Sequence, residues 1–218
     1  MKQMRNITIL ILVTFSTAAW GQFPSSYGFK AGLSIADQSW RISDLDYTFD
    51  TEALFTPTVA MFLEAFKGDH FSFQLDAAYA NKGSKSTVES VSVRHLEGGV
   101  LRANTGEETS SEFSCISFSP MARYRFDLER LVPYFLLGPR IDLLLNYASD
   151  SEYPLESWQG YTIGLTVGTG VEYSLEKLNL FAEIQFQPDL SPLTNKDPLL
   201  INNNMMAITL GVRRIVSF

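Results

Sequence analysis

The sequence predicts an all-β fold: an eight-stranded antiparallel up-and-down transmembrane β-barrel that follows a cleaved signal peptide. Three observations predict it: segments of alternating apolar and polar residues, connections that are alternately short and long, and, beyond residue 21, no apolar run long enough for a membrane helix. The clearest segment is Tyr161–Tyr173, in which apolar and aromatic residues alternate strictly with Thr, Gly and Glu. This period of two describes a strand with two unlike faces. Tilted by about 40°, such a strand rises roughly 30 Å, about the thickness of a bilayer core.

The first 21 residues have the pattern of a secretion signal. Lys2 and Arg5 form a basic start, Ile7–Ala19 an apolar stretch, and Ala19-Trp20-Gly21 a small-x-small cleavage site. We therefore expect residues 1–21 to be removed and residues 22–218 to form one outer-membrane β-barrel domain. Lipid offers no hydrogen-bond partner to open backbone groups, so a membrane protein without membrane helices has to close its sheet.

The first three strands follow from the same alternation. Tyr27–Ala36 sets aromatic and aliphatic residues at odd positions against Gly, Lys and Ser at even positions. Pro57–Phe66 continues this pattern, and the tight turn Lys67–His70 leads directly into Phe71–Ala80, where Phe, Leu, Ala and Tyr occupy the odd positions. These segments are therefore expected as strands one to three.

The fourth and fifth strands, Phe113–Phe126 and Val132–Tyr147, are joined by the short turn Asp127–Leu131. Each contains an internal proline, Pro120 and Pro139, which has no N–H group for the sheet. We expect a bulge or a local break at each proline.

Tyr161–Tyr173 is the sixth strand, and the turn Ser174–Leu178 leads to the seventh, Leu180–Gln187; the eighth is Met205–Phe218. The remaining connections are long and polar: Arg41–Thr56, Ser86–Glu112, Ala148–Gly160 and Pro188–Asn204. Short turns at one end and long loops at the other are typical of outer-membrane barrels, with the short turns in the periplasm. An even strand count then places both termini on the periplasmic side, and the barrel itself is expected in the cell outer membrane.

The polar faces of the strands carry ten charged residues, five of each sign. We expect these to form a charge network in the lumen: Lys30, Glu64, Asp76, Arg123, Arg125, Arg140, Asp142, Glu172, Glu183 and Arg213. A narrow lumen needs such balance because buried charges must be paired, and eight strands enclose only enough space for side chains. The sequence thus favours a plugged interior; a small-solute pore and a soluble lipocalin-like ligand-binding barrel are the alternatives.

Aromatic residues are expected where the strands meet the two membrane–water interfaces: Trp40, Tyr161, Tyr173 and Phe218. The long segments are acidic; Arg41–Thr56, for example, sets one arginine against four carboxylates. The expected partners are outer-membrane lipid, lipopolysaccharide bridged weakly by cations, and an unidentified extracellular or envelope protein. The net charge of −7, which becomes −9 without Lys2 and Arg5, argues against a nucleic-acid partner.

No catalytic, cofactor or metal site is expected. The acidic segment Asp44–Glu52 lacks the spacing of an EF-hand, and Cys115 is the only cysteine. His70 and His95 fall in connections at opposite ends of the barrel. A lipid-modifying enzyme would need His95 close to a loop serine, Ser90 or Ser92, and a carboxylate.

Four segments are similar to the PorT-family outer-membrane β-barrel proteins of Bacteroidetes: Tyr27–Asp37, Pro133–Leu145, Gly168–Tyr173 and Leu210–Phe218. The resemblance covers nearly all of Tyr27–Phe218. It implies an eight-stranded barrel without a cofactor, inserted by the outer-membrane assembly machinery through the strand that ends at Phe218. The founding member of that family is linked to type IX protein secretion, so the resemblance also implies an accessory role in secretion.

Overall fold

The computed structural model describes residues 24–42, 47–50, 52–87, 108–126, 128, 130–149, 159–175, 178–193 and 199–216. The expected signal peptide, His95 and Phe218 lie outside these ranges. The strands are β1 (Ser26–Ile42), β2 (Tyr47–Asp50), β3 (Glu52–Ala65), β4 (Phe71–Thr87), β5 (Glu108–Arg125), β6 (Leu131–Ser149), β7 (Tyr161–Ser174), β8 (Asn179–Pro188) and β9 (Leu199–Ile215). None of the described residues forms a helix long and apolar enough to cross a membrane.

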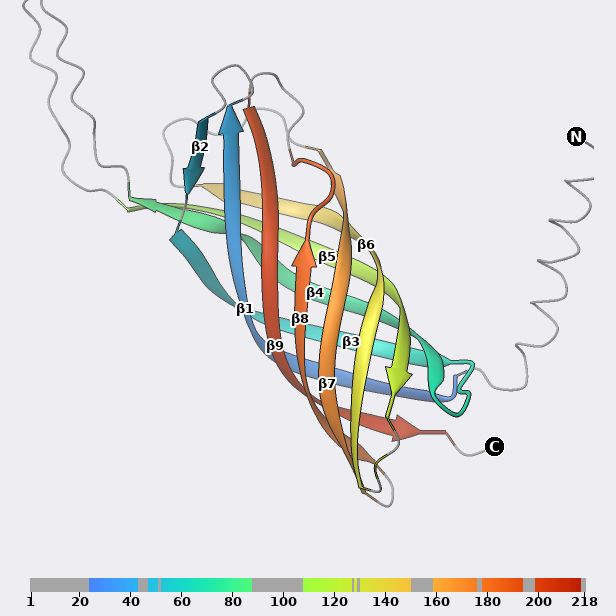
Figure 1. The fold of residues 1–218 in the computed structure, drawn as a ribbon. Helices are drawn as coiled ribbons and strands as arrows, with labels where there is room; N and C mark the ends of the chain where they lie inside the picture. Colours follow the sequence, from blue (N-terminus) through green and yellow to red (C-terminus); the bar gives the residue numbers. More distant parts are fainter. Residues whose placement is uncertain are drawn as a thin grey trace, which may run out of the picture.

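The strands form one antiparallel sheet that closes into a barrel (Figure 1). From β3 to β9 each strand pairs with the next along the chain, β1 pairs with both β2 and β3, and β9 returns to pair with β1 from Ser26↔Ile215 to Ile42↔Leu199. The short β2 pairs with residues 39–42 of β1, while β3 pairs with residues 26–36 on the same edge. Because β2 and β3 share one position in the wall, the barrel has eight positions, and the predicted eight-stranded fold is confirmed.

The strands continue beyond the apolar segments that predicted them. β1 runs to Ile42 and β4 to Thr87, and β3 begins at Glu52. The prediction of a long loop at Arg41–Thr56 is therefore wrong, since β1 and β2 are separated only by residues 43–46. Backbone groups must still find partners where side chains turn polar, and a neighbouring strand supplies them without any apolar alternation.

The two internal prolines produce one shared break. The β5–β6 ladder has Phe118 opposite Ile141 and Ala122 opposite Leu137, in the same register, and no residues pair between them. That register sets Pro120 opposite Pro139 inside the gap. On their other edges, the prolines pair with Leu75 of β4 and Leu165 of β7. The expected local break is thus confirmed, without a bulge at either proline.

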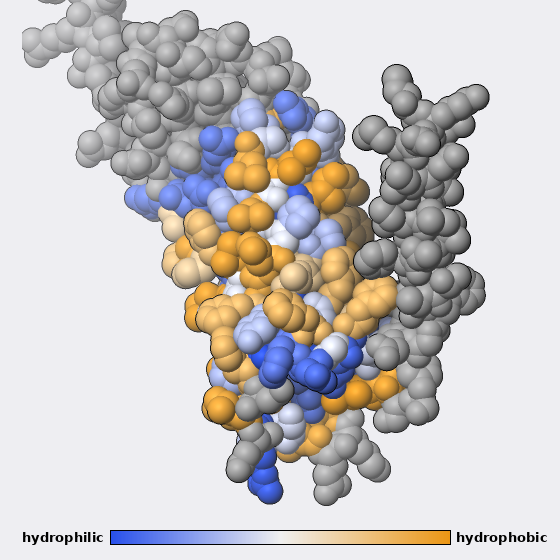
Figure 2. Space-filling view, turned by 45° about the vertical axis from the view of Figure 1, so that its right-hand side comes forward, coloured by the Kyte–Doolittle hydropathy of each residue, from blue (hydrophilic) through white to orange (hydrophobic). Residues whose placement is uncertain are grey.

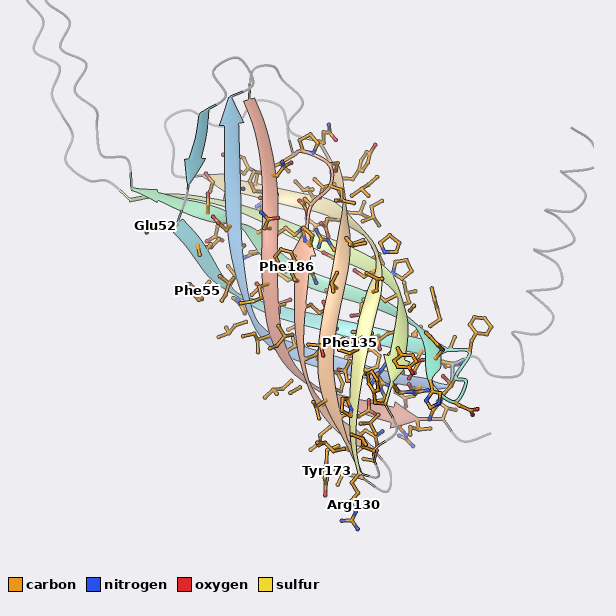
Figure 3. The ribbon with its side chains drawn as sticks, viewed as in Figure 1. Glu52, Phe55, Arg130, Phe135, Tyr173 and Phe186 are labelled. Carbon is orange, nitrogen blue, oxygen red and sulfur yellow. The ribbon has the colours of Figure 1, made fainter. Side chains whose placement is uncertain are left out.

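The apolar faces of the strands point outward. On β7, Tyr161, Ile163 and Val167 are exposed, whereas Thr162, Thr166 and Glu172 are buried. In Figure 2, hydrophobic residues predominate across the middle of the visible face and hydrophilic ones gather toward its ends. Figure 3 shows Phe55 of β3 and Tyr173 of β7 projecting away from the wall. This arrangement is the reverse of a soluble lipocalin-like barrel, whose apolar face points inward.

Candidate functional site in the barrel lumen

Inward-facing charged residues fill the lumen, and each of the strands β1 and β3 to β9 contributes at least one. The structure places all ten residues of the expected network here, each of them buried. It adds two that the sequence analysis missed, Lys82 on β4 and Asp189 just after β8, both also buried. Among the residues that the structure describes, the buried charged side chains thus comprise six cations and six carboxylates: Lys30, Lys82, Arg123, Arg125, Arg140 and Arg213 against Glu64, Asp76, Asp142, Glu172, Glu183 and Asp189.

A turn-end cluster lies near the short turns and consists of Glu64, Arg123, Arg125, Glu172 and Arg213. Glu64 accepts from Arg125 at 3.1 Å and from Arg213 at 2.8 Å. Glu172 pairs with Arg123 at 2.5 Å and with Arg213 at 3.3 Å. Arg213 therefore bridges both carboxylates, which joins β3, β5, β7 and β9 across the lumen.

A central cluster is built around one lysine. Lys30 Nζ lies 2.5 Å from Asp76 Oδ2 and 2.5 Å from Glu183 Oε1. The Tyr134 hydroxyl donates to the second oxygen of Glu183 at 2.8 Å. A single cation thus holds two carboxylates that arrive from opposite sides of the barrel, β4 and β8.

A loop-end cluster contains Lys82, Arg140, Asp142 and Asp189. Lys82 pairs with Asp142 at 2.5 Å and with Asp189 at 3.0 Å. Arg140 pairs with the same two carboxylates, with Asp142 at 2.9 Å. Two cations and two anions alternate around this ring, so the cluster is neutral and each carboxylate has two partners.

Glutamines connect the three clusters into one column. Gln74 accepts from Arg123 and Arg213 and donates to Asp76 at 2.8 Å. On the other side of the central cluster, Gln185 donates to Glu183 at 2.9 Å, and Gln187 links Gln185 to Arg140. Charge-assisted hydrogen bonds are roughly twice as strong as neutral ones, so a connected column holds the interior in one arrangement.

Apolar and aromatic side chains occupy the space that remains between the ions. They form one buried group: Phe62, Met121, Tyr134, Leu136 and Phe181. The Arg123 guanidinium lies 3.8 Å from the Tyr134 ring centre, and that of Arg213 lies 5.1 Å from the Phe62 ring. Cation–π contacts of this kind add to the ion pairs when they are shielded from water. The lumen of the described barrel is therefore packed with side chains.

The expected interface aromatics lie at the strand ends. Tyr161, at the loop end of β7, is 52% exposed, and Tyr173, at its turn end, is 41% exposed. Both side chains point outward, as an anchoring role at the two interfaces requires. For Trp40 the structure describes only the backbone, within β1, and Phe218 lies outside the described residues.

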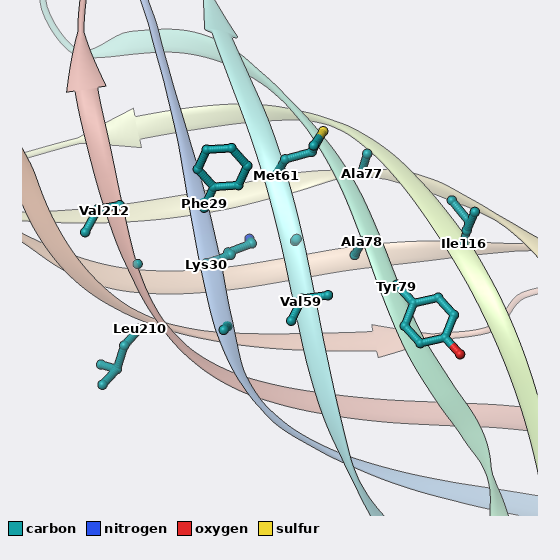
Figure 4. A pocket seen from close by; sticks show the side chains of 13 residues that line it. Phe29, Lys30, Val59, Met61, Ala77, Ala78, Tyr79, Ile116, Leu210 and Val212 are labelled. Carbon is teal, nitrogen blue, oxygen red and sulfur yellow. The ribbon is translucent and has the colours of Figure 1, made fainter.

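An apolar hollow of about 590 Å³ opens on the outer wall where β9, β1, β3, β4 and β5 meet (Figure 4). Its lining combines small residues, Ala31 and Ala77 among them, with larger apolar side chains such as Phe29, Met61 and Leu210. Lys30 also contributes to the lining, but its ammonium group is turned into the lumen and paired there.

The described residues contain no group of three His, Cys, Asp or Glu that could hold a metal ion. His70 lies in the short connection between β3 and β4. The candidate loop residues Ser90, Ser92 and His95 lie outside the described part of the chain.

A closed antiparallel barrel with an apolar exterior and an ionic interior defines the class of outer-membrane β-barrel proteins. The chain belongs to the family described as outer membrane protein beta-barrel domain, whose model matches residues 20–195. This membership also indicates an outer-membrane location. Comparison with curated protein sequences gave no match.

Several solved structures are similar to this chain. Neisserial surface protein A (NspA) has 19% identity and a TM-score of 0.48, with 87% of this chain and 97% of that chain covered. Ail, the attachment invasion locus protein of Yersinia pestis, has 13% identity and a TM-score of 0.41, with coverage of 86% and 97%. The outer membrane protease OmpT from Escherichia coli has 8% identity and a TM-score of 0.40, with coverage of 89% and 98%.

Proposed function

We propose that this protein is a closed outer-membrane barrel that displays acidic connections outside the cell and has a non-enzymatic structural or interaction role in the envelope. The observation that carries the proposal is the packed lumen, in which six cations and six carboxylates are paired in one connected column. Buried ions that partner one another leave little room or free charge for a passing solute. Partners would therefore bind at the rim, the end of the barrel where the long acidic connections leave the strands.

The charges outside the barrel support an orientation with both termini in the periplasm. Carboxylates with exposed or half-buried side chains occur at the end where the long connections leave: Asp37, Glu52 and Glu112. The connections at this end add Asp44, Asp46, Asp150, Glu152 and Glu156. Lipopolysaccharide is also anionic, so an acidic rim suits association through bridging divalent cations, which prefer carboxylate oxygens.

An epitope-insertion experiment tests this orientation. A short tag inserted between residues 88 and 107 is expected to bind antibody on intact cells, because this connection would lie outside. The same tag inserted at Lys67–Asp69 is expected to bind antibody only after the outer membrane is permeabilised. Equal labelling of the second tag on intact cells would contradict the proposed orientation.

Planar-bilayer recording tests the closed lumen. The purified wild-type barrel is expected to give no channels of defined size, because charged and aromatic side chains fill its interior along its length. A preparation heated to unfold the barrel before reconstitution serves as the control for background leakage. Stable current steps of reproducible size from folded protein only would favour the alternative, a small-solute pore.

The resemblance to the PorT family supports a finer version of the proposal, an accessory to protein secretion inserted by the outer-membrane assembly machinery. Cross-linking of the full-length protein in its own cells would then capture an envelope partner through the acidic rim. A variant with Asp150→Asn, Glu152→Gln and Glu156→Gln is expected to lose that product. The product should persist in the control Asp69→Asn, at the opposite end. A product unchanged in the triple variant would argue against recognition through this connection.

A further inference from the structure

A second hollow lies on the outside of the barrel at the end of the short turns. It has a volume of about 660 Å³ and lies between the β1–β9 seam and the turn that precedes β8. Apolar side chains form much of its lining, referred to below as its apolar floor: Phe29, Leu175, Leu178, Val212 and Ile215. Unlike the mid-wall hollow in Figure 4, this one contains an outward-facing cation, Arg214.

Arg214 departs from the pattern of the outer wall. It is the only positively charged side chain on the outward strand faces among the side chains that the structure describes. Within the same described part of the chain, no carboxylate forms an ion pair with it. Each arginine of the lumen, in contrast, is paired. An arginine on a lipid-facing wall needs an anionic partner or water at the membrane surface.

The surroundings of Arg214 match an amphipathic ligand. Its partner across the β1–β9 seam is Tyr27, which also faces outward, so the two side chains are direct neighbours at the wall. Two residue pairs further into the wall, at the next outward-facing position, Phe29 lies opposite Val212. The hollow therefore has a polar edge, made by a guanidinium group and a phenol, and an apolar floor that continues toward the middle of the barrel.

We propose that this hollow binds a phospholipid of the adjacent leaflet, with the lipid phosphate on Arg214 and an acyl chain along Phe29 and Val212. A guanidinium group binds phosphate through two parallel hydrogen bonds, which a lipid headgroup provides at this depth. The apolar floor then contacts methylene groups that already lie in the bilayer. That the leaflet is the periplasmic one rests on the orientation proposed above, whereas binding of the phosphate to Arg214 does not.

Native mass spectrometry of the purified barrel tests this site. The probe is dimyristoyl phosphatidylglycerol, and dimyristoyl glycerol has the same chains without the phosphate. Arg214→Gln is expected to weaken retention of phosphatidylglycerol by about tenfold, the effect of losing one charge-assisted contact. Arg130→Gln is the matched control, because Arg130 is exposed in a neighbouring short turn outside the hollow (Figure 3). It should retain the lipid as the wild type does.

Three outcomes would overturn the proposal: unchanged retention in Arg214→Gln, an equal loss in Arg130→Gln, or retention of dimyristoyl glycerol as strong as that of phosphatidylglycerol. Inorganic phosphate is added as a competitor, and a lipid site predicts that it displaces little phosphatidylglycerol at equal concentration. A gel shift on heating checks that each variant is folded. If Arg214→Gln fails this check, Arg214→Lys replaces it, and weaker retention is again expected because lysine lacks the two-pronged geometry.

Discussion

Replacing Lys30 with methionine is expected to destabilise the folded barrel by about 3–5 kcal/mol. Of the cations in the described part of the chain, Lys30 alone pairs with Asp76 and Glu183, and its ammonium group lies 2.5 Å from an oxygen of each. Methionine fills a similar volume but leaves two buried carboxylates facing each other without a counter-charge. A urea titration that follows the folded and unfolded bands on unheated gels would measure the change in free energy of unfolding.

Two further variants separate the electrostatic cause from a packing cause. Lys67→Met makes the same substitution at an exposed position in the β3–β4 turn, where a change within about 0.5 kcal/mol is expected. The triple variant Lys30→Met, Asp76→Asn, Glu183→Gln removes all three charges and is expected to recover most of the lost stability, since neutral replacement of buried ions is often tolerated. A Lys30→Met barrel within about 1 kcal/mol of the wild type would contradict the paired-ion account of the lumen.

The sequence predicted the barrel because one physical demand acts on every strand at once. Outward residues contact lipid and inward residues contact one another, so the alternation appears in strands as far apart in the sequence as β1 and β9. It appears most cleanly in β7, where nothing interrupts it from Tyr161 to Tyr173. Outside the bilayer this demand ends, and the strands continue on backbone pairing alone. The ends of β1, β4 and β9 were therefore beyond the reach of the pattern.

Lys82 and Asp189 show why the lumen could be predicted only in part. Lys82 follows Asn81, an outward polar residue that ends the apolar alternation of β4, although Lys82 keeps the inward parity of Gln74 and Asp76. Asp189 likewise keeps the inward parity of Gln187, one residue past β8, but it lies in the segment Pro188–Asn204, which the sequence predicts to be a loop. Because the two missed residues have opposite charges, omitting both left the predicted interior balanced. Charge balance constrains the total charge of the lumen, but it does not identify the residues that lie there. The balanced prediction therefore did not reveal that two residues were missing.

The end of β8 also explains how Asp189 comes to lie inside. β8 is the shortest strand of the barrel ring and stops at Pro188, while β7 and β9 continue past it. The backbone N–H of Asp189 then donates to Asn203 O on β9 at 3.0 Å, and Asp189 forms an isolated bridge with Gly164 on β7. These bonds fix the chain across the wall at the point where the carboxylate reaches Lys82 and Arg140. Tertiary pairing of this kind is not visible in a local pattern.

The second large effect is expected from Gly32→Ala, which should leave little or no folded barrel, a loss of about 4–5 kcal/mol or more. Gly32 lies on β1 at the seam with β9, paired with Thr209. A β-carbon at Gly32 would lie 1.9 Å from the carbonyl oxygen of Ile208 and 2.7 Å from the α-carbon of Thr209. Both atoms belong to the backbone of β9, so no side-chain movement relieves the contact. The two strands that close the barrel would have to separate.

Gly160→Ala provides the matched control, because a β-carbon at Gly160 would have no atom within 4 Å. The same methyl group is expected to change the free energy of unfolding by no more than about 0.5 kcal/mol there. The comparison uses the folded fraction on unheated gels after refolding into lipid vesicles. Equal folded fractions for the two variants would mean that β1 and β9 approach less closely than described. An open edge costs several kcal/mol per unpaired group in lipid, so a seam that cannot close removes the barrel as a whole rather than one contact.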